Sequence, residues 1–375
     1  MRLSKTIRNL SRIRKELDGL APPAPAIDRL RDLAAVLPNP GNLRGRCHIP
    51  EGLAAGAPLV VVLHGCTQDA ALYDHGTGWS RLADRHGFAL LFPEQQRANN
   101  SGLCFNWFLA GDSQRGRGEA ASIKALVDAM VKRHALDPRR VFVTGLSAGG
   151  AMASVMLATY PELFAGGAII AGIPYGCASG AAEAFDCMAG RAGADAGELS
   201  ASVRRASPHQ GPWPRISVWQ GSADPIVVPS NAQSIIVQWA GLHGVAPAPH
   251  RIDMVDGHPR RVWLGADGEE LIEHYQVAGM GHGTPLRPGT GDGESGMAGA
   301  HMLDVGLSST DRIAAFFGIA PQPANAPKAP RRAKSSTTGP AVPTRRRGGK
   351  SAAAEPADGV RAVIEQALKA AGLLR

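Results

Sequence analysis

The sequence predicts an α/β fold in which a doubly wound, mostly parallel sheet is flanked by helices. Between about residues 41 and 320, short apolar or β-branched runs alternate with segments of helical periodicity. Most of the runs are apolar at nearly every position, which is typical of parallel strands that are buried on both faces. A chain of 375 residues is long enough for one such domain with appended segments.

Six strands are expected along this domain. They cover residues 59–63 (LVVVL), 88–92 (FALLF), 141–144, 168–171, 216–219 and 273–277. Helices are expected between them, for example at 119–134, where one apolar stripe recurs at helical spacing. A second helix contains AMASVMLATY and ends before Pro161, because proline cannot continue it. A hairpin is expected around Asp253 and Asp256.

The ends of the chain differ from its body in charge. The net charge is +8, but residues 1–20 hold six Lys/Arg against two acidic residues, and residues 321–350 hold eight against none. Residues 351–375 are balanced, so residues 21–320 carry a net charge of −4. A basic surface spread over the body is thereby excluded, and we expect no specific nucleic-acid partner.

Four segments follow from these patterns. Residues 1–40 are expected to form a basic amphipathic helix and a linker, with the helix docked on the body or in contact with an anionic surface. Residues 41–320 form the α/β domain. Residues 321–350 are rich in Pro, Ala, Lys and Arg and predict a disordered basic linker that can contact anionic surfaces, and residues 351–375 predict a short helix.

The five cysteines show no CxxC pair and no spacing suited to zinc, so no structural metal is expected. An even subset could form disulfide bonds if the protein is exported, and Cys177–Cys187 and Cys66–Cys104 are the first pairs to test. The first 20 residues lack the apolar centre of a secretory signal, which favours the cytoplasm instead. No run of 18 apolar residues predicts a transmembrane helix.

The stretch VFVTGLSAGG places Ser147 in a G-x-S-x-G pattern, between an apolar strand and a helix. A chain of this composition is expected to contain roughly a third of one such match by chance. The inference therefore depends on the strand and helix on either side of the pattern. A sharp strand-to-helix turn holds such a serine in an unfavourable backbone conformation that exposes its hydroxyl, and the flanking glycines let neighbouring elements approach. We therefore expect Ser147 to be a nucleophile.

A serine hydroxyl needs a base and an orienting acid, which in such folds follow later strands in the order Ser, acid, His. Asp224 follows the strand 216–220 in the loop GSADP, and His282 lies among glycines after the last predicted strand. Other acids and histidines are less well placed, because none follows the end of a buried strand. They are Asp253, Asp256, His258, His274 and His301.

Two backbone amides are expected to bind the developing oxyanion. Ala148 follows the nucleophile, and Cys66 lies just after the strand 59–63 in the segment HGC. Structural roles are expected for the side chains of His64 and Cys66. Such chemistry requires neither a metal nor an organic cofactor.

Taken together, these segments resemble the polyhydroxybutyrate (PHB) depolymerase family of esterases, relatives of the feruloyl and acetylxylan esterases within the α/β-hydrolase fold. The resemblance covers roughly residues 41–318. It is carried by VVLHGCTQDA, CFNWF, RGRGEAASI, VFVTGLSAGGAMASVMLATYPELFAGGA, AGIPYGCA, WQGSADPIV, GMGHG and DVGLSSTDRIAAFFGI.

The resemblance implies a serine ester hydrolase, with Ser147, Asp224 and His282 on the triad positions and Cys66 on the oxyanion loop. Its expected substrates are amorphous poly- or oligo-3-hydroxybutyrate or short acyl esters, and the alternative is a feruloyl- or acetylxylan-type carbohydrate esterase. Trp107 in CFNWF is expected to line the acyl cleft or to belong to the core. By the same resemblance an extracellular location is expected.

Overall fold

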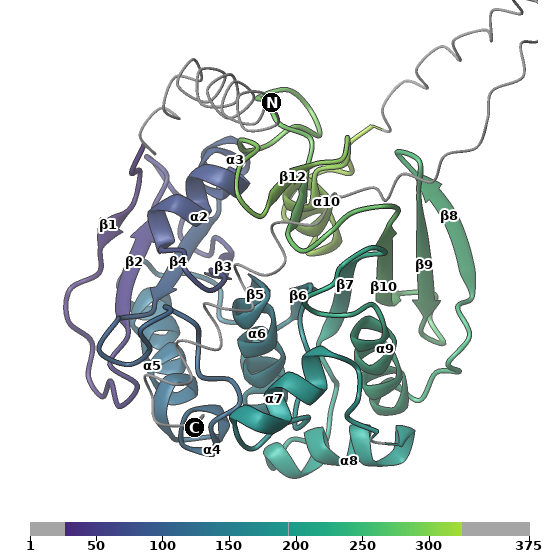
Figure 1. Ribbon diagram of the computed structural model, residues 1–375. Coiled ribbons are helices and arrows are strands. Elements are labelled where there is room, and N and C mark those ends of the chain that lie inside the picture. The colour runs from purple at the N-terminus through teal and green to yellow at the C-terminus, as the bar shows by residue number, and fades with distance from the viewer. Residues whose placement is uncertain (1–26, 194, 325–375) are drawn as a thin grey trace, which may run out of the picture.

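A computed structural model of the protein describes residues 27–193 and 195–324 (Figure 1). Within these residues, ten strands form one sheet in the order β1-β2-β4-β3-β5-β6-β7-β10-β9-β8. Their bounds are Arg31–Asp32 (β1), Arg44–His48 (β2), Leu59–Leu63 (β3), Ala89–Glu94 (β4), Val141–Leu146 (β5), Gly166–Ile170 (β6), Arg215–Gly221 (β7), Arg251–Val255 (β8), His258–Leu264 (β9) and Glu270–Val277 (β10). The predicted α/β fold is confirmed.

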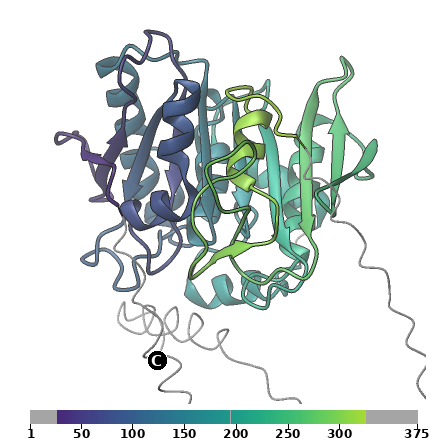
Figure 2. The same cartoon turned by 90° about the horizontal axis from the view of Figure 1, so that it is seen from above.

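The centre of the sheet is parallel and its two edges are antiparallel. Strands β4, β3, β5, β6, β7 and β10 pair in parallel, whereas β1 and β2 extend one side and β9 and β8 the other in antiparallel fashion. The two edges lie at opposite ends of the sheet in both views (Figures 1 and 2). From β3 the chain passes to β4 on one side and then returns to β5 on the other. The carboxyl ends of β3 and β5 therefore meet at a topological switch point, where open α/β sheets bind ligands.

Helices cover both faces of the sheet (Figure 1). One face holds α2 (Ala70–Thr77), α3 (Trp79–His86) and α10 (Ser309–Phe316), and the other holds α5 (Gly118–Arg133), α6 (Ala148–Thr159), α8 (Ala196–Ala206) and α9 (Ser230–His243). The remaining elements are short: α4 (Ala110–Ser113), η1 (Pro161–Leu163), α7 (Ala181–Met188) and a separate two-stranded sheet of β11 (Thr284–Leu286) and β12 (Met302–Asp304).

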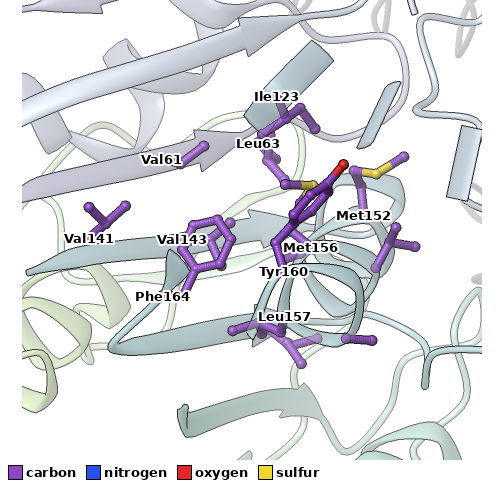
Figure 3. Close-up of a cluster of buried hydrophobic side chains, with 14 of the residues drawn as sticks. Val61, Leu63, Ile123, Val141, Val143, Met152, Met156, Leu157, Tyr160 and Phe164 are labelled. Carbon is purple, nitrogen blue, oxygen red and sulfur yellow. The ribbon is translucent and has the colours of Figure 1, made fainter. Parts of the chain in front are cut away.

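Two apolar cores form because successive side chains of a strand point to opposite faces. In β3, Val61 and Leu63 belong to the core under α5 and α6, whereas Val60 and Val62 belong to the core under α2, α3 and α10. Figure 3 shows part of the first core, where Met152 and Met156 of α6 lie over the central strands. The rigid sheet fixes the positions of the loops that follow its strands.

The six predicted strands all exist, with ends that differ by up to three residues. The second one begins at Ala89 and continues to Glu94, and the last begins at Glu270 rather than residue 273. The predicted hairpin is confirmed as β8 and β9. Strands β1 and β2 have no counterpart among the predictions. Strand β1 has only two residues, and the polar and apolar residues of β2 alternate rather than forming an apolar run.

Several predictions fall on other parts of the chain. The basic helix at residues 1–20, residues 325–350 of the linker and the segment 351–375 lie outside the described residues. Among the helices that the structure describes, none has the length and apolar character needed to cross a bilayer.

Candidate active site

Ser147 lies between the last residue of β5 and the first residue of α6. Its backbone angles are φ 56° and ψ −116°, in a region that residues other than glycine rarely adopt. The turn is held because the Ser147 amide donates a 2.9 Å hydrogen bond to the carbonyl of Ile170, at the end of β6. The strained strand-to-helix turn predicted from the sequence is therefore present.

The glycines on either side of Ser147 are required by close packing. A Cβ atom on Gly149 would lie 2.3 Å from the carbonyl oxygen of Leu63 and 2.5 Å from that of His64. A Cβ atom on Gly145 would lie 2.3 Å from the carbonyl oxygen of Gly149. All three distances are shorter than any side chain tolerates, so α6 can start directly against the end of β3 only because these residues are glycines.

Asp224 lies in the loop after β7 and is buried. Its Oδ1 accepts hydrogen bonds from the amides of Ile226 (2.9 Å) and Val227 (3.0 Å), and its Oδ2 accepts one from Nε2 of Gln220 (3.1 Å). These donors fix the carboxylate and leave Oδ2 directed at His282.

His282 lies in the loop after β10 and joins the other two residues. Its Nδ1 is 2.8 Å from Oδ2 of Asp224, and its Nε2 is 2.9 Å from Oγ of Ser147. The Asp224 carboxylate can accept a hydrogen bond from an N–H group at Nδ1. In that tautomer Nε2 carries no proton and is free to accept the one from the serine. The His282 loop is held in turn because Nδ1 of His301 lies 3.2 Å from the His282 carbonyl. The structure thus brings together the three side chains that the sequence singled out.

The competing acids and histidines lie elsewhere. Asp253 pairs with Arg251 and Arg260 at the edge of the sheet, and Asp256 pairs with Arg312. His258 hydrogen-bonds the backbone of Val305 and Ala278, and His274 is buried within β10. His301 is the one competitor near Ser147, but its ring packs edge-on against His282 rather than replacing it.

The two expected oxyanion donors both border the space beside Ser147. Ala148 is the first residue of α6, so its amide has no acceptor within the helix. Cys66 lies three residues beyond β3, at the switch point of the sheet. Both residues line the same hollow as Ser147.

The hollow beside Ser147 is almost entirely apolar, and Trp107 belongs to its wall. Sequence reasoning missed the other apolar residues of the wall, because isolated apolar residues in loops or in a short helix carry no signal that separates them from the core. These residues are Phe108, Ile173, Ala184, Phe185, Met188 and Val227. Such a wall suits a short acyl group.

Two disulfide bonds support this region, and they are the pairs proposed for testing from the sequence. Cys66–Cys104 joins the loop after β3 to the segment that carries Trp107. Cys177–Cys187 holds α7, which supplies one wall of the hollow. Cys47 is buried and unpaired. His64 has the structural role expected of it: burial lowers its pKa, and its Nε2 accepts from the amide of Gln95 at 3.1 Å.

Comparisons with known proteins identify the family of the chain. The family model described as Esterase PHB depolymerase matches residues 46–252. Over 284 residues the chain is 50% identical to poly(3-hydroxyalkanoate) depolymerase C of Paucimonas lemoignei. The aligned region covers 75% of this chain and 68% of that protein. The chain is 32% identical over 273 residues to an acetylxylan esterase of Coprinopsis cinerea, covering 70% and 72%.

Among solved structures, an acetyl xylan esterase from Aspergillus awamori superposes with a TM-score of 0.66 at 24% identity, covering 78% of this chain and 99% of that one. This likeness concerns the fold. The family match and the relatives of 30% identity or more establish the rest: the chain belongs to the Esterase PHB depolymerase family and is a carboxylic ester hydrolase of the α/β-hydrolase fold.

Proposed function

We propose that the protein hydrolyses esters of short hydroxyalkanoic acids through a Ser147–His282–Asp224 triad. The observation that carries this proposal is the pair of contacts at His282, 2.9 Å to the Ser147 hydroxyl and 2.8 Å to the Asp224 carboxylate. A nucleophile, its base and the group that orients the base are thereby in hydrogen-bond reach.

The reaction begins when the Ser147 oxygen attacks the ester carbonyl while Nε2 of His282 takes the serine proton. Asp224 holds the proton of Nδ1 and stabilises the imidazolium that forms. The amides of Ala148 and Cys66 donate to the oxyanion of the tetrahedral intermediate. His282 then gives its proton to the leaving alcohol, and the acyl group remains on Ser147. Water attacks the acyl-enzyme by the reverse use of the same groups and releases the acid.

The proposed substrate is poly- or oligo-3-hydroxybutyrate, or another ester of a short acyl group. Two observations support it: the relative at 50% identity is named a poly(3-hydroxyalkanoate) depolymerase, and the wall beside Ser147 is apolar. The second candidate is a carbohydrate esterase, which the acetylxylan esterases at 30–33% identity favour. The two candidates share the triad and differ in the acyl and alcohol groups they accept.

We also propose that the protein acts outside the cytoplasm. The support is its two disulfide bonds, since disulfide bonds form and persist in oxidising compartments. Intact mass with and without a reductant, on protein isolated from its native host, tests whether both bonds exist there.

Replacement of the nucleophile tests the mechanism. Ser147→Ala should lower kcat for p-nitrophenyl butyrate by on the order of 10⁶, because the covalent route is removed. Ser154→Ala is a matched control: Ser154 is buried on the same helix and donates to the carbonyl of Gly150. The control should keep kcat within about twofold, and a Ser147→Ala variant that did the same would refute the mechanism.

A substrate panel separates the two candidates. Release of 3-hydroxybutyrate from amorphous polymer and its oligomers should exceed release of acetate from acetylated xylan or of ferulate from feruloylated xylan. The opposite order, with the same dependence on Ser147, would favour the carbohydrate esterase.

A further inference from the structure

Two motifs that carry the family resemblance, CFNWF and RGRGEAASI, have no part in the proposed chemistry. The structure brings them together at Glu119, in the first turn of α5, where Asn106 of the first motif meets Glu119 of the second. Glu119 is only 1% exposed and does not line the hollow beside Ser147. Burying a carboxyl group costs free energy unless neighbouring groups form hydrogen bonds with it.

Three N–H donors converge on this carboxyl group. Oε1 accepts from Nε2 of Gln95 at 2.5 Å and from Nδ2 of Asn106 at 2.8 Å, and Oε2 accepts from the amide of Asn106 at 2.8 Å. Asn106 is therefore bound through both its side chain and its backbone. Since Trp107 is the next residue, Glu119 also fixes the start of the pocket wall.

The hydrogen bonds continue from Asn106 to Cys104. Oδ1 of Asn106 accepts from Nδ2 of Asn100 at 3.0 Å, and Oδ1 of Asn100 accepts from the amides of Gly102 (3.0 Å) and Cys104 (3.3 Å). Gln95, the other partner of Glu119, donates to the carbonyl of Cys104 at 3.0 Å. Residues 100, 102, 104 and 106 are thus joined to the buried acid, directly at Asn106 and through Asn100 and Gln95 at the others.

The same segment holds the loop that carries Cys66. Cys104 is bonded to Cys66 through the disulfide, and the carbonyl of Gly102 accepts from the amide of Thr67 at 2.7 Å. Residues 66 and 67, at the end of β3, are therefore tied to the 100–107 segment by a covalent bond and by a hydrogen bond. A continuous path of hydrogen bonds and one disulfide bond therefore connects Asn106 to Cys66.

The protonation of Glu119 decides which substitution mimics it. Burial, together with the neighbouring Asp112, raises the pKa of Glu119 to about 8, although the three N–H donors act in the opposite direction. The side chain is then a neutral carboxylic acid near pH 7. Glutamine has the charge of this form and keeps one acceptor oxygen, which can accept from Gln95 and from the Asn106 side chain, whereas alanine removes all three acceptor contacts.

We infer that Glu119 is a positioning residue for ester hydrolysis: through Asn106, Asn100 and the Cys66–Cys104 disulfide it sets the place of the Cys66 amide relative to Ser147. This inference rests on the proposed function, in which Cys66 supplies one of two oxyanion donors. Its effect should appear in the transition state and not in substrate binding, because the oxyanion forms only during the reaction.

The test measures hydrolysis of p-nitrophenyl acetate by four variants of the full chain. Glu119→Ala should lower kcat about tenfold to a hundredfold with KM changed less than about threefold, a loss below that of deleting an oxyanion donor outright. Glu119→Gln should lose less of kcat than Glu119→Ala, since its amide oxygen keeps two of the three contacts and only the Asn106 backbone amide loses its acceptor. Butaneboronic acid, which forms a tetrahedral adduct with the serine, should lose affinity in Glu119→Ala by the same factor as kcat/KM.

Ser122→Ala is the matched control. Ser122 is buried one turn further along α5 and accepts a 2.8 Å hydrogen bond from the distant amide of Gly41, but in the described part of the chain it makes no direct hydrogen bond to residues 100–107. Its loss should lower the melting temperature and leave kcat within about twofold. A merely structural Glu119 would behave in the same way.

Asn100→Ala tests the same path should Glu119→Ala fail to fold, and it should show the same fall in kcat at constant KM. The inference is overturned if a folded Glu119→Ala or Asn100→Ala variant keeps wild-type kcat and boronate affinity. That result would leave the proposed function intact as long as Ser147→Ala is inactive. Activity in Ser147→Ala would instead remove the proposed function itself.

Discussion

Asp224 decides which nitrogen of His282 carries the proton. Its Oδ1 is occupied by the amides of Ile226 and Val227, so only Oδ2 faces the imidazole. In Asp224→Asn the amide oxygen should keep the two backbone donors, and the NH₂ group would face Nδ1. The ring would then hold its proton on Nε2, which cannot accept from Ser147.

Asp224→Asn should therefore lower kcat by on the order of 10³ to 10⁴ without loss of folding. The measurement is steady-state hydrolysis of p-nitrophenyl butyrate, with the melting temperature as a check on the fold. Asp253→Asn, at the edge of the sheet, is the control and should keep wild-type kcat. Full activity of Asp224→Asn would show that another acid orients His282.

The absence of a Cβ atom at Gly149 allows α6 to begin directly after Ser147. Because a Cβ at this position would lie 2.3 Å and 2.5 Å from two backbone oxygens of the β3 end, the backbone itself would have to move. Gly149→Ala should therefore lower the free energy of unfolding by at least about 2 kcal/mol, as overpacking typically does.

Urea denaturation measures this loss. Gly111→Ala in α4 is the control, since a Cβ there meets no atom within 4 Å, and its stability should change by less than about 0.5 kcal/mol. Equal stabilities for the two variants would mean that the contact between α6 and the β3 end is looser than described.

At the scale of elements, α7 separates two hollows on the surface. Phe185 and Met188 line the hollow beside Ser147 and also a second one bounded by Pro225, Ile226 and Val228. Truncating either side chain would join the two spaces. The wall that α7 supplies should therefore limit the length of the acyl group.

Phe185→Ala and Met188→Ala should raise kcat/KM for p-nitrophenyl octanoate relative to p-nitrophenyl butyrate by about tenfold, a change expected when a few methylene groups gain an apolar site. Hydrolysis of both esters by each variant supplies the ratio. An unchanged ratio in both variants would show that the acyl chain leaves the site in another direction.

Sequence patterns predicted the central strands well because burial on both faces of the sheet leaves a run of apolar residues. A strand buried on both faces, such as β3, must be apolar throughout, and the elbow at Ser147 leaves a glycine pattern. Helix α7 left no comparable signal. Phe185 and Met188 face a hollow made by residues from distant loops, and only the folded chain brings these together.

At the scale of the whole molecule, buried histidines set part of the response to acid. Burial lowers the pKa of His274 in β10 and of His243 at the end of α9 to about 4 each. An unfolded histidine titrates near 6.5, so the unfolded state binds more protons as the pH falls below that value. The stability from each neutral ring is thus present above about pH 6.5 and is lost progressively toward pH 4.

His274→Leu should remove one such contribution. Among the residues that the structure describes, neither ring nitrogen of His274 has a hydrogen-bond partner, so the substitution removes no polar contact seen there. The variant should become more stable relative to the wild type as the pH falls from about 7 to about 4, and its melting temperature should rise relative to that of the wild type. The difference in the free energy of unfolding should reach about 3 kcal/mol at pH 4. A difference that is constant over this range would mean that His274 titrates in the folded state as it does in the unfolded state.

The fold and the candidate site were predictable from the sequence to different depths. Ser147, Asp224 and His282 each follow a buried strand, and parallel strands bring their carboxyl ends to one edge of the sheet. Glu119 could not be assigned, because an acid among small residues at the start of a helix most often faces solvent. Its burial depends on Asn106 and Gln95, whose positions follow from the folded loops.

The central claim is that Ser147 is the nucleophile of an ester hydrolase, and covalent labelling tests it most directly. The protein would be treated with p-nitrophenyl butylphosphonate, and its intact mass and tryptic peptides measured alongside the remaining activity. The account predicts one butylphosphonyl group per chain, located on Ser147, formed in step with the loss of activity and absent from Ser147→Ala. Inactivation with the label on another residue, or with no label at all, would contradict it.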